Sequence, residues 1–230
     1  MRAKDRVAIS WCDPGQVDGA FASSLVTLTA ARSSRLAEVI RIRGGGLLSR
    51  TRNEMVKAFL DRTQTAWLLM LDSDQTISPD VFDLLVESAH DTAAPVVAGL
   101  CFGAWETGGP YPMPLPNLFD LIDGSYTPIS EIEPRTLRRV DGAGTGCLLI
   151  HRDVLQGMRD DAPMGLRDWC WFADGPTGDG RWLSEDLTFC KRLGERGVPI
   201  HAHTGAVLPH RKWHWETDAT YDYWKAAGDG

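Results

Sequence analysis

The sequence predicts an α/β fold with a doubly wound, mainly parallel sheet and an irregular second half. Three observations predict it: short apolar runs alternate with helical patterns over the first hundred residues, a Gly- and Pro-rich stretch at residues 108–116 ends that alternation, and two acids follow the most apolar run. With 230 residues, the chain is long enough to bury a sizeable core in one domain.

The first half of the chain carries the regular pattern. Its hydrophobic periodicity and turn residues predict strands at residues 7–11, 38–42, 66–71 and 95–100, and helices at residues 17–31, at 52–60 and from Ser78 onward. The third helix has the clearest start, because Ser78 can cap it, Pro79 suits its first position and Asp80 complements the helix dipole. Such alternation is typical of a parallel sheet, which binds ligands beyond the carboxyl ends of its strands.

The second half of the chain is irregular. Periodicity is lost at residues 103–134 and again at residues 163–181, and connectors of this length are rarely idle in a compact domain. We expect the first of them to be a binding loop. Regular pattern returns as strands at residues 137–140, 145–150, 198–201 and 206–208, a short helix at 154–158, and a helix capped by Ser184.

Composition disfavours several classes of function. The formal net charge of −7 disfavours binding to nucleic acid, whose affinity comes mostly from neutralised phosphates. No apolar run approaches the roughly 18 residues of a membrane-spanning helix, and the N-terminus lacks the pattern of an export signal. Five cysteines, odd in number and never spaced C-x-x-C, argue against a disulfide framework or a zinc ribbon. We therefore expect a soluble, cytoplasmic protein.

The central candidate for chemistry is Asp72-Ser73-Asp74, which follows the apolar run at residues 66–71. The alternation of side chains along an extended backbone would place both carboxylates on one side, where they repel each other. A hard divalent cation with oxygen ligands, able to bind phosphate oxygens as well, would offset that repulsion. The alternative is that these acids shape a turn or cap a helix, although Ser78 already caps the next helix.

Three segments together resemble the GT-A glycosyltransferases. Residues 67–74, preceded by Arg52-Asn53-Glu54 on a helix, resemble the D-x-D centre of that fold. Residues 182–190 (WLSEDLTFC) resemble a W-x-x-E-D-x-x-F-C segment, and residues 204–210 (TGAVLPH) resemble a strand that ends in a metal-binding histidine. The chain looks most like the family 2-like group, which includes small bacterial and phage enzymes, and the resemblance covers most of it.

The resemblance implies a metal site and a general base. Asp74 and His210 would ligate Mn²⁺ or Mg²⁺, and Asp72 would contact the ion through water or hold the ribose of the donor. Asp186 would act as the base for the acceptor hydroxyl, and Glu185 would orient the acceptor or the base. Without the resemblance, His210 is a surface histidine, and the two acids complement the dipole of their helix.

The resemblance also implies a donor site at the end of the first strand and around the Arg-Asn helix. Arg52 could bind the diphosphate through its fork of donors. The expected donor contacts are Ser10, Trp11, Asp13, Arg52, Asn53, Asp72 and Ser73. The sequence Trp11-Cys12-Asp13-Pro14 departs from a stereotyped donor signature, so the base of the nucleotide stays open.

Aromatic residues gather in the irregular segments and at the C-terminus. Their flat faces could pack against sugar rings or close over them, or they could bury one another. The C-terminal group could instead dock on a partner subunit, which would make the protein a homo-oligomer. The residues are Trp105, Trp169, Trp171, Phe172 and Trp182, then Trp213, Trp215, Tyr221, Tyr223 and Trp224.

Three other functions compete with sugar transfer. Residues 72–76 fit the D-x-D-x-T pattern of haloacid-dehalogenase-like phosphatases, with Asp72 as nucleophile, but they follow the third strand and not the first, and no later Lys and paired-Asp motif is convincing. A nucleotidyltransferase would use the same metal and nucleotide but would join phosphates. A non-catalytic carbohydrate-binding protein is supported by the aromatic residues alone.

We therefore predict a metal-dependent transfer of a hexosyl group from a UDP- or GDP-sugar to a hydroxyl of a carbohydrate, a protein or another acceptor. Residues 1–100 would form the nucleotide-sugar-binding half, residues 101–212 the acceptor-binding and catalytic half of the same domain, and residues 213–230 an aromatic tail. A base at Asp186 suggests inversion at the anomeric carbon.

Overall fold

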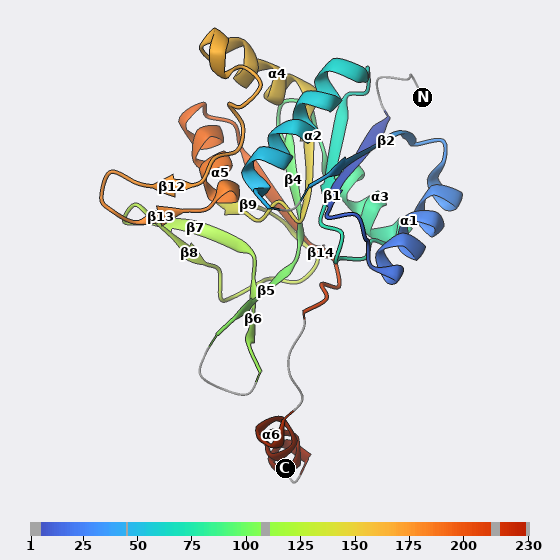
Figure 1. Cartoon of the computed structure of the whole chain (residues 1–230), viewed down its shortest axis with the longest axis vertical. Helices are drawn as coiled ribbons and strands as arrows, with labels where there is room; N and C mark the ends of the chain where they lie inside the picture. The colour runs from blue at the N-terminus through green and yellow to red at the C-terminus, as the bar shows by residue number, and fades with distance from the viewer. Residues whose placement is uncertain (1–5, 45, 107–110, 213–216, 229–230) are drawn as a thin grey trace.

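A seven-stranded sheet forms the centre of the molecule (Figure 1). The computed structural model describes residues 6–44, 46–106, 111–212 and 217–228. In spatial order the strands are β2 (Leu36–Arg43), β1 (Val7–Asp13), β3 (Trp67–Leu71), β11 (Cys147–His151), β4 (Val96–Leu100), β14 (Ile200–Val207) and β9 (Leu137–Val140). The three middle strands are apolar along their length because both of their faces are covered.

Five of the seven strands run in the same direction. β1 pairs in parallel with both β2 and β3, and β4 pairs in parallel with β14. β11 runs antiparallel between β3 and β4, and β9 runs antiparallel to β14 at the edge. The predicted mainly parallel sheet is therefore confirmed, and the carboxyl ends of β1, β3 and β14 lie at one edge of it.

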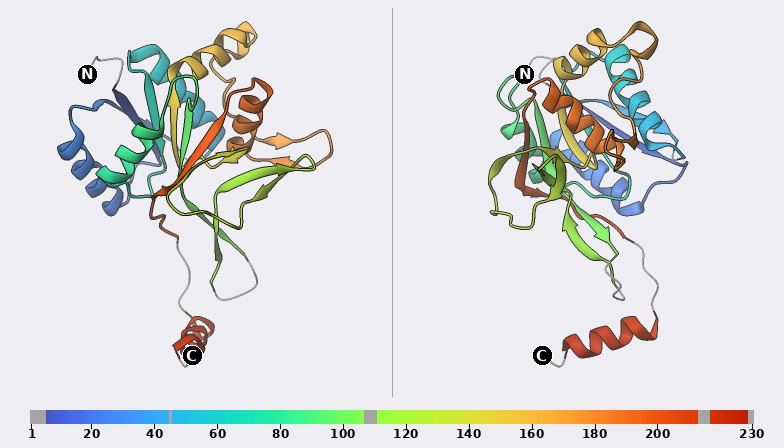
Figure 2. Two further views of the ribbon diagram at one scale, coloured as in Figure 1. Left: turned by 180° about the vertical axis from the view of Figure 1, so that it is seen from behind. Right: turned by 90° about the vertical axis from the view of Figure 1, so that its left-hand side faces the viewer.

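Helices cover both faces of the sheet, which gives three layers (Figure 2). One face is covered by α2 (Leu48–Arg62), α4 (Arg152–Asp161) and α5 (Glu185–Glu195), and the other by α1 (Gly19–Arg32) and α3 (Pro79–Ser88). Successive strand residues supply the two cores in turn, so that Ala8 faces the first core and Ile9 the second. Ser78 caps α3 as predicted, by accepting the backbone N–H of Val81.

The segments predicted to be irregular contain short hairpins. β5 (Phe102–Trp105) pairs with β6 (Met113–Pro116), β7 (Leu118–Ile122) pairs with β8 (Ser125–Pro128) and β10 (Gly142–Ala143), and β12 (Gly175–Pro176) pairs with β13 (Trp182–Leu183). Asp123 and Gly124 form the two-residue turn between β7 and β8, with positive φ values of 49° and 76°. Asp-Gly is a strong hairpin signal, but strands this short show little periodicity, so the sequence analysis did not find them.

Two regular elements also differ from the predictions. One strand, β14, replaces the two strands predicted at residues 198–201 and 206–208, and its pairing with β4 is irregular between His203 and Val207. Burial nevertheless alternates along the whole of β14, and the polar and small residues at 203–205 divide its apolar positions, which is why the sequence pattern predicts two strands. The helix predicted at residues 154–158 extends over the ten residues of α4.

The aromatic residues of the late irregular segment divide into buried and exposed ones. Trp171 and Phe172 are 0% and 2% exposed, and Phe172 stacks on Phe189 of α5 with 4.7 Å between ring centroids. These two are core residues, so the interpretation that they pack on a sugar is wrong for them. Trp213 and Trp215, which were predicted in the aromatic tail, lie outside the described residues.

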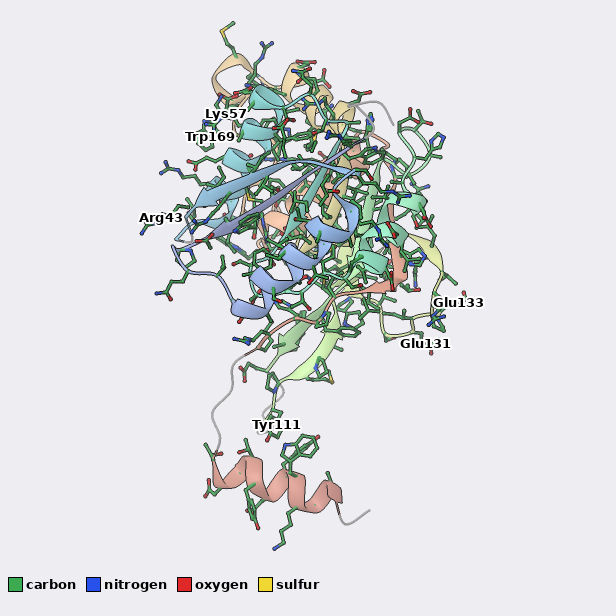
Figure 3. All side chains as sticks on the ribbon, turned by 90° about the vertical axis from the view of Figure 1, so that its right-hand side faces the viewer. Arg43, Lys57, Tyr111, Glu131, Glu133 and Trp169 are labelled. Carbon is green, nitrogen blue, oxygen red and sulfur yellow. The ribbon has the colours of Figure 1, made fainter. Side chains whose placement is uncertain are left out.

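The C-terminal tail forms a helix, α6 (Asp218–Gly228), that lies apart from the sheet (Figure 1). Its Tyr223 and Trp224 rings contact the Tyr111 ring edge-to-face, with centroid distances of 5.2 and 5.8 Å. Figure 3 shows Tyr111 beside this helix. None of the described helices is both long enough and apolar enough to cross a membrane.

Candidate metal and transfer site

Asp72, Ser73 and Asp74 form a tight turn at the carboxyl end of β3. The N–H of Asp72 donates to Gly146 O at 2.9 Å, and the N–H of Gln75 donates to Asp72 O at 3.2 Å. A Cβ at Gly146 would lie 2.9 Å from Asp72 Oδ2 and 2.3 Å from Gln75 Nε2, so any larger residue there would displace these two side chains. Contacts with Gly146 and Gln75 therefore fix this turn. Asp72 and Ser73 are half-buried in it, and Asp74 is exposed.

The structure brings His210 against Asp74. His210 Nδ1 lies 2.9 Å from Phe102 O, and Nε2 lies 3.1 Å from Asp74 Oδ2. Because a carbonyl oxygen only accepts hydrogen bonds, Nδ1 carries the proton of the neutral ring, and the Nε2 lone pair then points at the carboxylate. Two electron-rich atoms at this distance require a proton or a metal cation between them.

Neighbouring positive charge lowers the pKa of Asp74. Burial alone would raise this pKa. When a proton lies between the two groups, His210 is an imidazolium whose hydrogen bond and charge outweigh burial, and the Lys212 ammonium, 3.7 Å from Oδ2, adds to the effect. Asp74 is therefore ionised at neutral pH. An ionised carboxylate opposite an imidazole nitrogen offers two of the ligand types that Mn²⁺ accepts.

The Asp74–His210 pair fits a metal that takes most of its ligands from outside the protein. Within the described ranges, no group of three or more His, Cys, Asp and Glu side chains is placed to hold a metal ion. The pair would supply two ligands, and phosphate oxygens and water could fill the other positions, as is common for Mg²⁺. The Phe102 carbonyl fixes the orientation of the imidazole, as hydrogen-bond partners of metal-bound histidines do.

Arg52 joins the acids of the β3 turn to the acids of α5. Its side chain is 5% exposed and donates to Asp72 Oδ1 at 3.2 Å, to Glu185 Oε1 at 2.5 Å and to Asp186 Oδ1. Burial disfavours the guanidinium charge, but the charges of Asp186, Asp72 and Glu185 outweigh burial and raise the pKa of Arg52. One guanidinium group thus faces the carboxylates of three acids. Because the acids outnumber the single cation, this cluster would favour the binding of a further cation nearby.

Asp186 and Glu185 lie in the first turn of α5, behind the N-cap Ser184. The Thr145 hydroxyl donates to Asp186 Oδ1 at 2.5 Å, and the same oxygen accepts from Arg52. Oδ2 is therefore the oxygen of Asp186 that is left for a ligand. Burial, and then the charge of Asp186, raise the pKa of Glu185, so Glu185 holds its negative charge less readily than an exposed glutamate.

The residues expected to frame the nucleotide at the end of β1 have partners within the protein. Ser10 is fully buried, and its hydroxyl lies 3.4 Å from Leu69 O. The Asp13 carboxylate accepts from two Arg41 nitrogens at 2.6 and 2.7 Å and from the Trp11 indole N–H at 3.1 Å. These bonds hold the pKa of Asp13 below its usual value, with Arg41 the main cause. A donor contact by Trp11, which is half-buried, stays a prediction.

Asn53 of α2 binds the backbone of the second irregular segment, residues 163–181, through hydrogen bonds. Its amide donates to Ser49 O and to Phe172 O, both at 2.7 Å, and its Oδ1 accepts the N–H groups of Trp171 at 3.2 Å and Phe172 at 3.1 Å. Both amide hydrogens and the carbonyl oxygen are used in these bonds, so Asn53 supports the fold beneath the site. Ser73 lies on the β3 turn, where its predicted contact with the donor stays a prediction.

Two features of this site go beyond the sequence analysis. The sequence pattern places Thr145 in a strand, and the structure adds its bond to Asp186. The resemblance implies a diphosphate contact for Arg52, which stays a prediction, and the structure adds its bonds to three carboxylates. The run of small residues at 142–146 is a sequence signal that could have indicated the role of Thr145. A Cβ at Gly144 would lie 1.7 Å from the Asn117 amide nitrogen, so this run lets the backbone pass close to its neighbours.

Comparison with known proteins identifies the type of fold. No protein-family model and no curated protein matches the chain. Among solved structures, GalNAc-T7 with UDP, GalNAc and Mn²⁺ is similar with a TM-score of 0.58 and 10% identity, over 97% of this chain and 47% of that chain. The crystal structure of A197 from STIV is similar with a TM-score of 0.53 and 17% identity, over 92% of this chain and 86% of that one.

These likenesses concern the fold alone. The chain spans about half the length of the GalNAc-T7 structure, since the match covers 47% of it. The mixed α/β architecture, with its large and mostly parallel central sheet, is similar to that of GT-A glycosyltransferases, as the sequence predicted. The chain therefore has a glycosyltransferase-like fold.

Proposed function

We propose that the protein transfers a hexosyl group from a UDP- or GDP-sugar to an acceptor hydroxyl and uses Mn²⁺ or Mg²⁺ to do so. The observation that carries this proposal is the pairing of Asp74 with His210 at the edge of the sheet where β3 and β14 end. The fold similarity to GalNAc-T7, whose structure holds UDP, GalNAc and Mn²⁺, supports the same class of donor and metal.

Asp74 and His210 would hold the metal at the donor end of the site. The bound ion would neutralise the diphosphate charge as the bond to the sugar breaks. Asp72 uses Oδ1 to accept from Arg52, so its Oδ2 is available to a water molecule or to a ribose hydroxyl. Lys212, 3.7 Å from Asp74 Oδ2, would bring a further positive charge to the phosphates.

Asp186 would take the proton of the acceptor hydroxyl. Its Oδ1 is held by Arg52 and Thr145, which leaves Oδ2 to accept that proton. The acceptor oxygen then forms a bond to the anomeric carbon, the bond from that carbon to the diphosphate oxygen breaks with its electron pair, and the hydroxyl proton moves to Asp186. Attack on the face opposite the diphosphate inverts the anomeric configuration.

Two alternative enzymes would use the same acids in another way. In a phosphatase Asp72 would be the nucleophile, but its Oδ1 accepts from Arg52, and the fold is similar to that of a glycosyltransferase. A nucleotidyltransferase would need the metal and the nucleotide but gives no role to a base at Asp186. Product analysis separates the three enzymes. A phosphatase releases free phosphate, a nucleotidyltransferase releases pyrophosphate, and the proposed glycosyltransferase releases a nucleoside diphosphate.

The cysteines support the proposed cytoplasmic location. All five are free thiols, and Cys101, Cys147 and Cys190 are buried. Burial raises the pKa of Cys147 and of Cys190 to about 12, which makes both thiols unreactive at neutral pH. A protein with this set of thiols suits a reducing compartment.

A thermal-shift screen tests the proposed function. We expect a UDP- or GDP-sugar to raise the melting temperature of the wild-type protein with Mn²⁺ present and not with EDTA, because ligands of the native state stabilise it by mass action. Asp74→Ala should lose this shift. Asp80→Ala is the matched control, since the Asp80 side chain is 96% exposed on the next helix. A shift that survives in EDTA or in Asp74→Ala would contradict the proposal.

A further inference from the structure

The β7–β8 hairpin and the β12–β13 hairpin lie side by side next to α5 (Figure 1). Residues of both hairpins and of α5 line a groove. It encloses about 490 Å³, which is within the size range of small-molecule sites. We call it the hairpin groove. Its walls include Leu121, Tyr126, Thr177, Arg181, Trp182 and Leu187.

The hairpin groove adjoins the loop that holds Asp186. Leu187, the residue after Asp186, lines the groove. A Cβ at Gly142 would lie 3.0 Å from both Leu187 Cδ2 and Tyr126 Cδ1, so these two side chains meet over Gly142. Three residues further along the chain, Thr145 donates to Asp186 Oδ1. A ligand in the groove would therefore lie next to the backbone that carries the proposed base.

Each hairpin contributes an exposed apolar side chain to the hairpin groove. Trp182 of β13 is 68% exposed, and Leu121 of β7 is 48% exposed. Trp182 lies in β13, two residues before the N-cap of α5, so its position is fixed relative to that helix. An exposed indole in a concave site is a natural surface for a flat ligand face.

The end of the groove near the hairpin turns is polar. Arg181 donates to Ser125 Oγ, to Gly124 O at 3.0 Å and to Asp179 Oδ2 at 2.8 Å. The Thr177 hydroxyl donates to Arg181 O at 2.9 Å. Arg181 thus ties the two hairpins together, and it leaves hydroxyl, carboxylate and guanidinium groups within reach of a bound molecule.

We propose that the hairpin groove binds the acceptor and that this acceptor is an oligosaccharide, an inference whose transfer step rests on the proposed function. A sugar ring has an apolar C–H face and a rim of hydroxyls. The first matches the indole of Trp182, and the second matches Thr177 and the Asp179–Arg181 pair. A lipid chain would instead cover that ion pair without replacing its hydration, which is unfavourable.

Binding to an array of immobilised oligosaccharides tests this inference. We expect the wild-type protein to bind a subset of the glycans, Trp182→Ala to bind them about tenfold more weakly, and Trp182→Phe to keep most of the affinity. Trp169→Ala is the matched control, because Trp169 is also exposed, at 44%, but lines a separate cavity with residues of α4 and α5. Thermal melting of each variant verifies that it is folded.

Three results would overturn the inference: no glycan on the array binds, Trp169→Ala weakens binding as much as Trp182→Ala, or an immobilised Ser- and Thr-rich peptide binds in place of glycans. Calorimetric titrations of UDP and of GDP in the presence of Mn²⁺ keep the two proposals apart. Trp182→Ala should leave the affinity for the nucleotide that binds unchanged. Glycan binding without binding of either nucleotide would refute sugar transfer and leave the groove assignment standing, whereas nucleotide binding without glycan binding would refute the groove assignment alone.

Discussion

The proposed donor end and the proposed acceptor end of the site are held in place by different means. At the donor end, Asp72 and Asp74 follow β3 directly, and His210 follows β14, so the central sheet fixes their positions. At the acceptor end, the walls are hairpins with strands of two to five residues, joined by side-chain bonds such as those of Arg181. A few substitutions in the hairpins could therefore alter the shape of the acceptor end. The geometry of the donor end, in contrast, could change only if the central sheet changed as well.

The largest effect is expected where the two ends meet, at Asp186. Asp186→Asn keeps the shape of the side chain but removes the base, so transfer should fall by about 10²–10⁴ in kcat, while Mn²⁺-dependent UDP binding stays as in the wild type. Single-turnover kinetics and UDP titration measure the two quantities. Glu195→Gln on the same helix, whose side chain is 62% exposed, is the control. Full transfer activity in Asp186→Asn would remove this residue from the mechanism.

Arg52→Ala should break the link between the two ends and destabilise the whole fold. It leaves Asp72, Glu185 and Asp186 without their shared cation, and we expect a loss of roughly 3 kcal/mol in the free energy of unfolding, at the low end for buried ion pairs because the acids keep some exposure. Urea denaturation measures it. Arg50→Ala, two residues earlier and 66% exposed, should cost less than about 0.5 kcal/mol. Equal losses in both variants would contradict the role of Arg52.

Asn53→Ala should affect the acceptor end more than the donor end. The variant leaves backbone groups of Trp171 and Phe172 without partners, at a cost of about 1–3 kcal/mol in unfolding free energy. Because these residues precede β12, the KM for acceptor should rise while Mn²⁺-dependent UDP affinity is kept. Gln156→Ala, which removes one exposed hydrogen bond on α4, is the control. A change confined to UDP affinity would show that Asn53 serves the donor instead.

The smallest effect concerns the ion pair of Asp13 with Arg41 at the end of β1. Arg41 lowers the pKa of Asp13 below the unfolded value near 3.8, so the pair stabilises the fold above that pH and loses its contribution as the pH falls through the lowered pKa. Arg41→Met should therefore be less stable than the wild type at pH 7, and this difference in stability should narrow as the pH falls below 3.8. Urea midpoints of both proteins at pH 7 and at a series of pH values below 3.8 measure it. A difference that stays the same over this range would exclude this linkage.

The sequence predicts the donor end well because its signals are local. An apolar run of five residues, four of them buried, forms β3, and the two acids that follow it can be read directly from the chain. Ser78 and Ser184 mark their helix starts by residue type alone, and both act as N-caps. The mainly parallel sheet follows from the same alternation of strands and helices.

The acceptor end could not be predicted in the same way. Strands such as β12 and β13 have two residues each, too few for a periodic pattern, and their pairing depends on contacts between residues far apart in the chain. Arg52 and Glu185 are 133 residues apart in the sequence, and no local sequence pattern predicts their ion pair. The Gly-rich sequence around Trp171 suggests an exposed aromatic residue. Trp171 is buried instead, because its backbone N–H donates to Asn53 and its ring belongs to the core that α5 helps to form.

The binding of Mn²⁺ itself tests the central claim most directly. Electron paramagnetic resonance measures free Mn²⁺ while the wild-type protein and Asp74→Ala are titrated with the metal, with and without UDP or GDP. The account predicts that the wild type takes up Mn²⁺ far more tightly when one of these nucleotides is present, and that Asp74→Ala does not, because Asp74 and the diphosphate share the ion. Equal uptake by both proteins, or uptake that neither nucleotide changes, would contradict it.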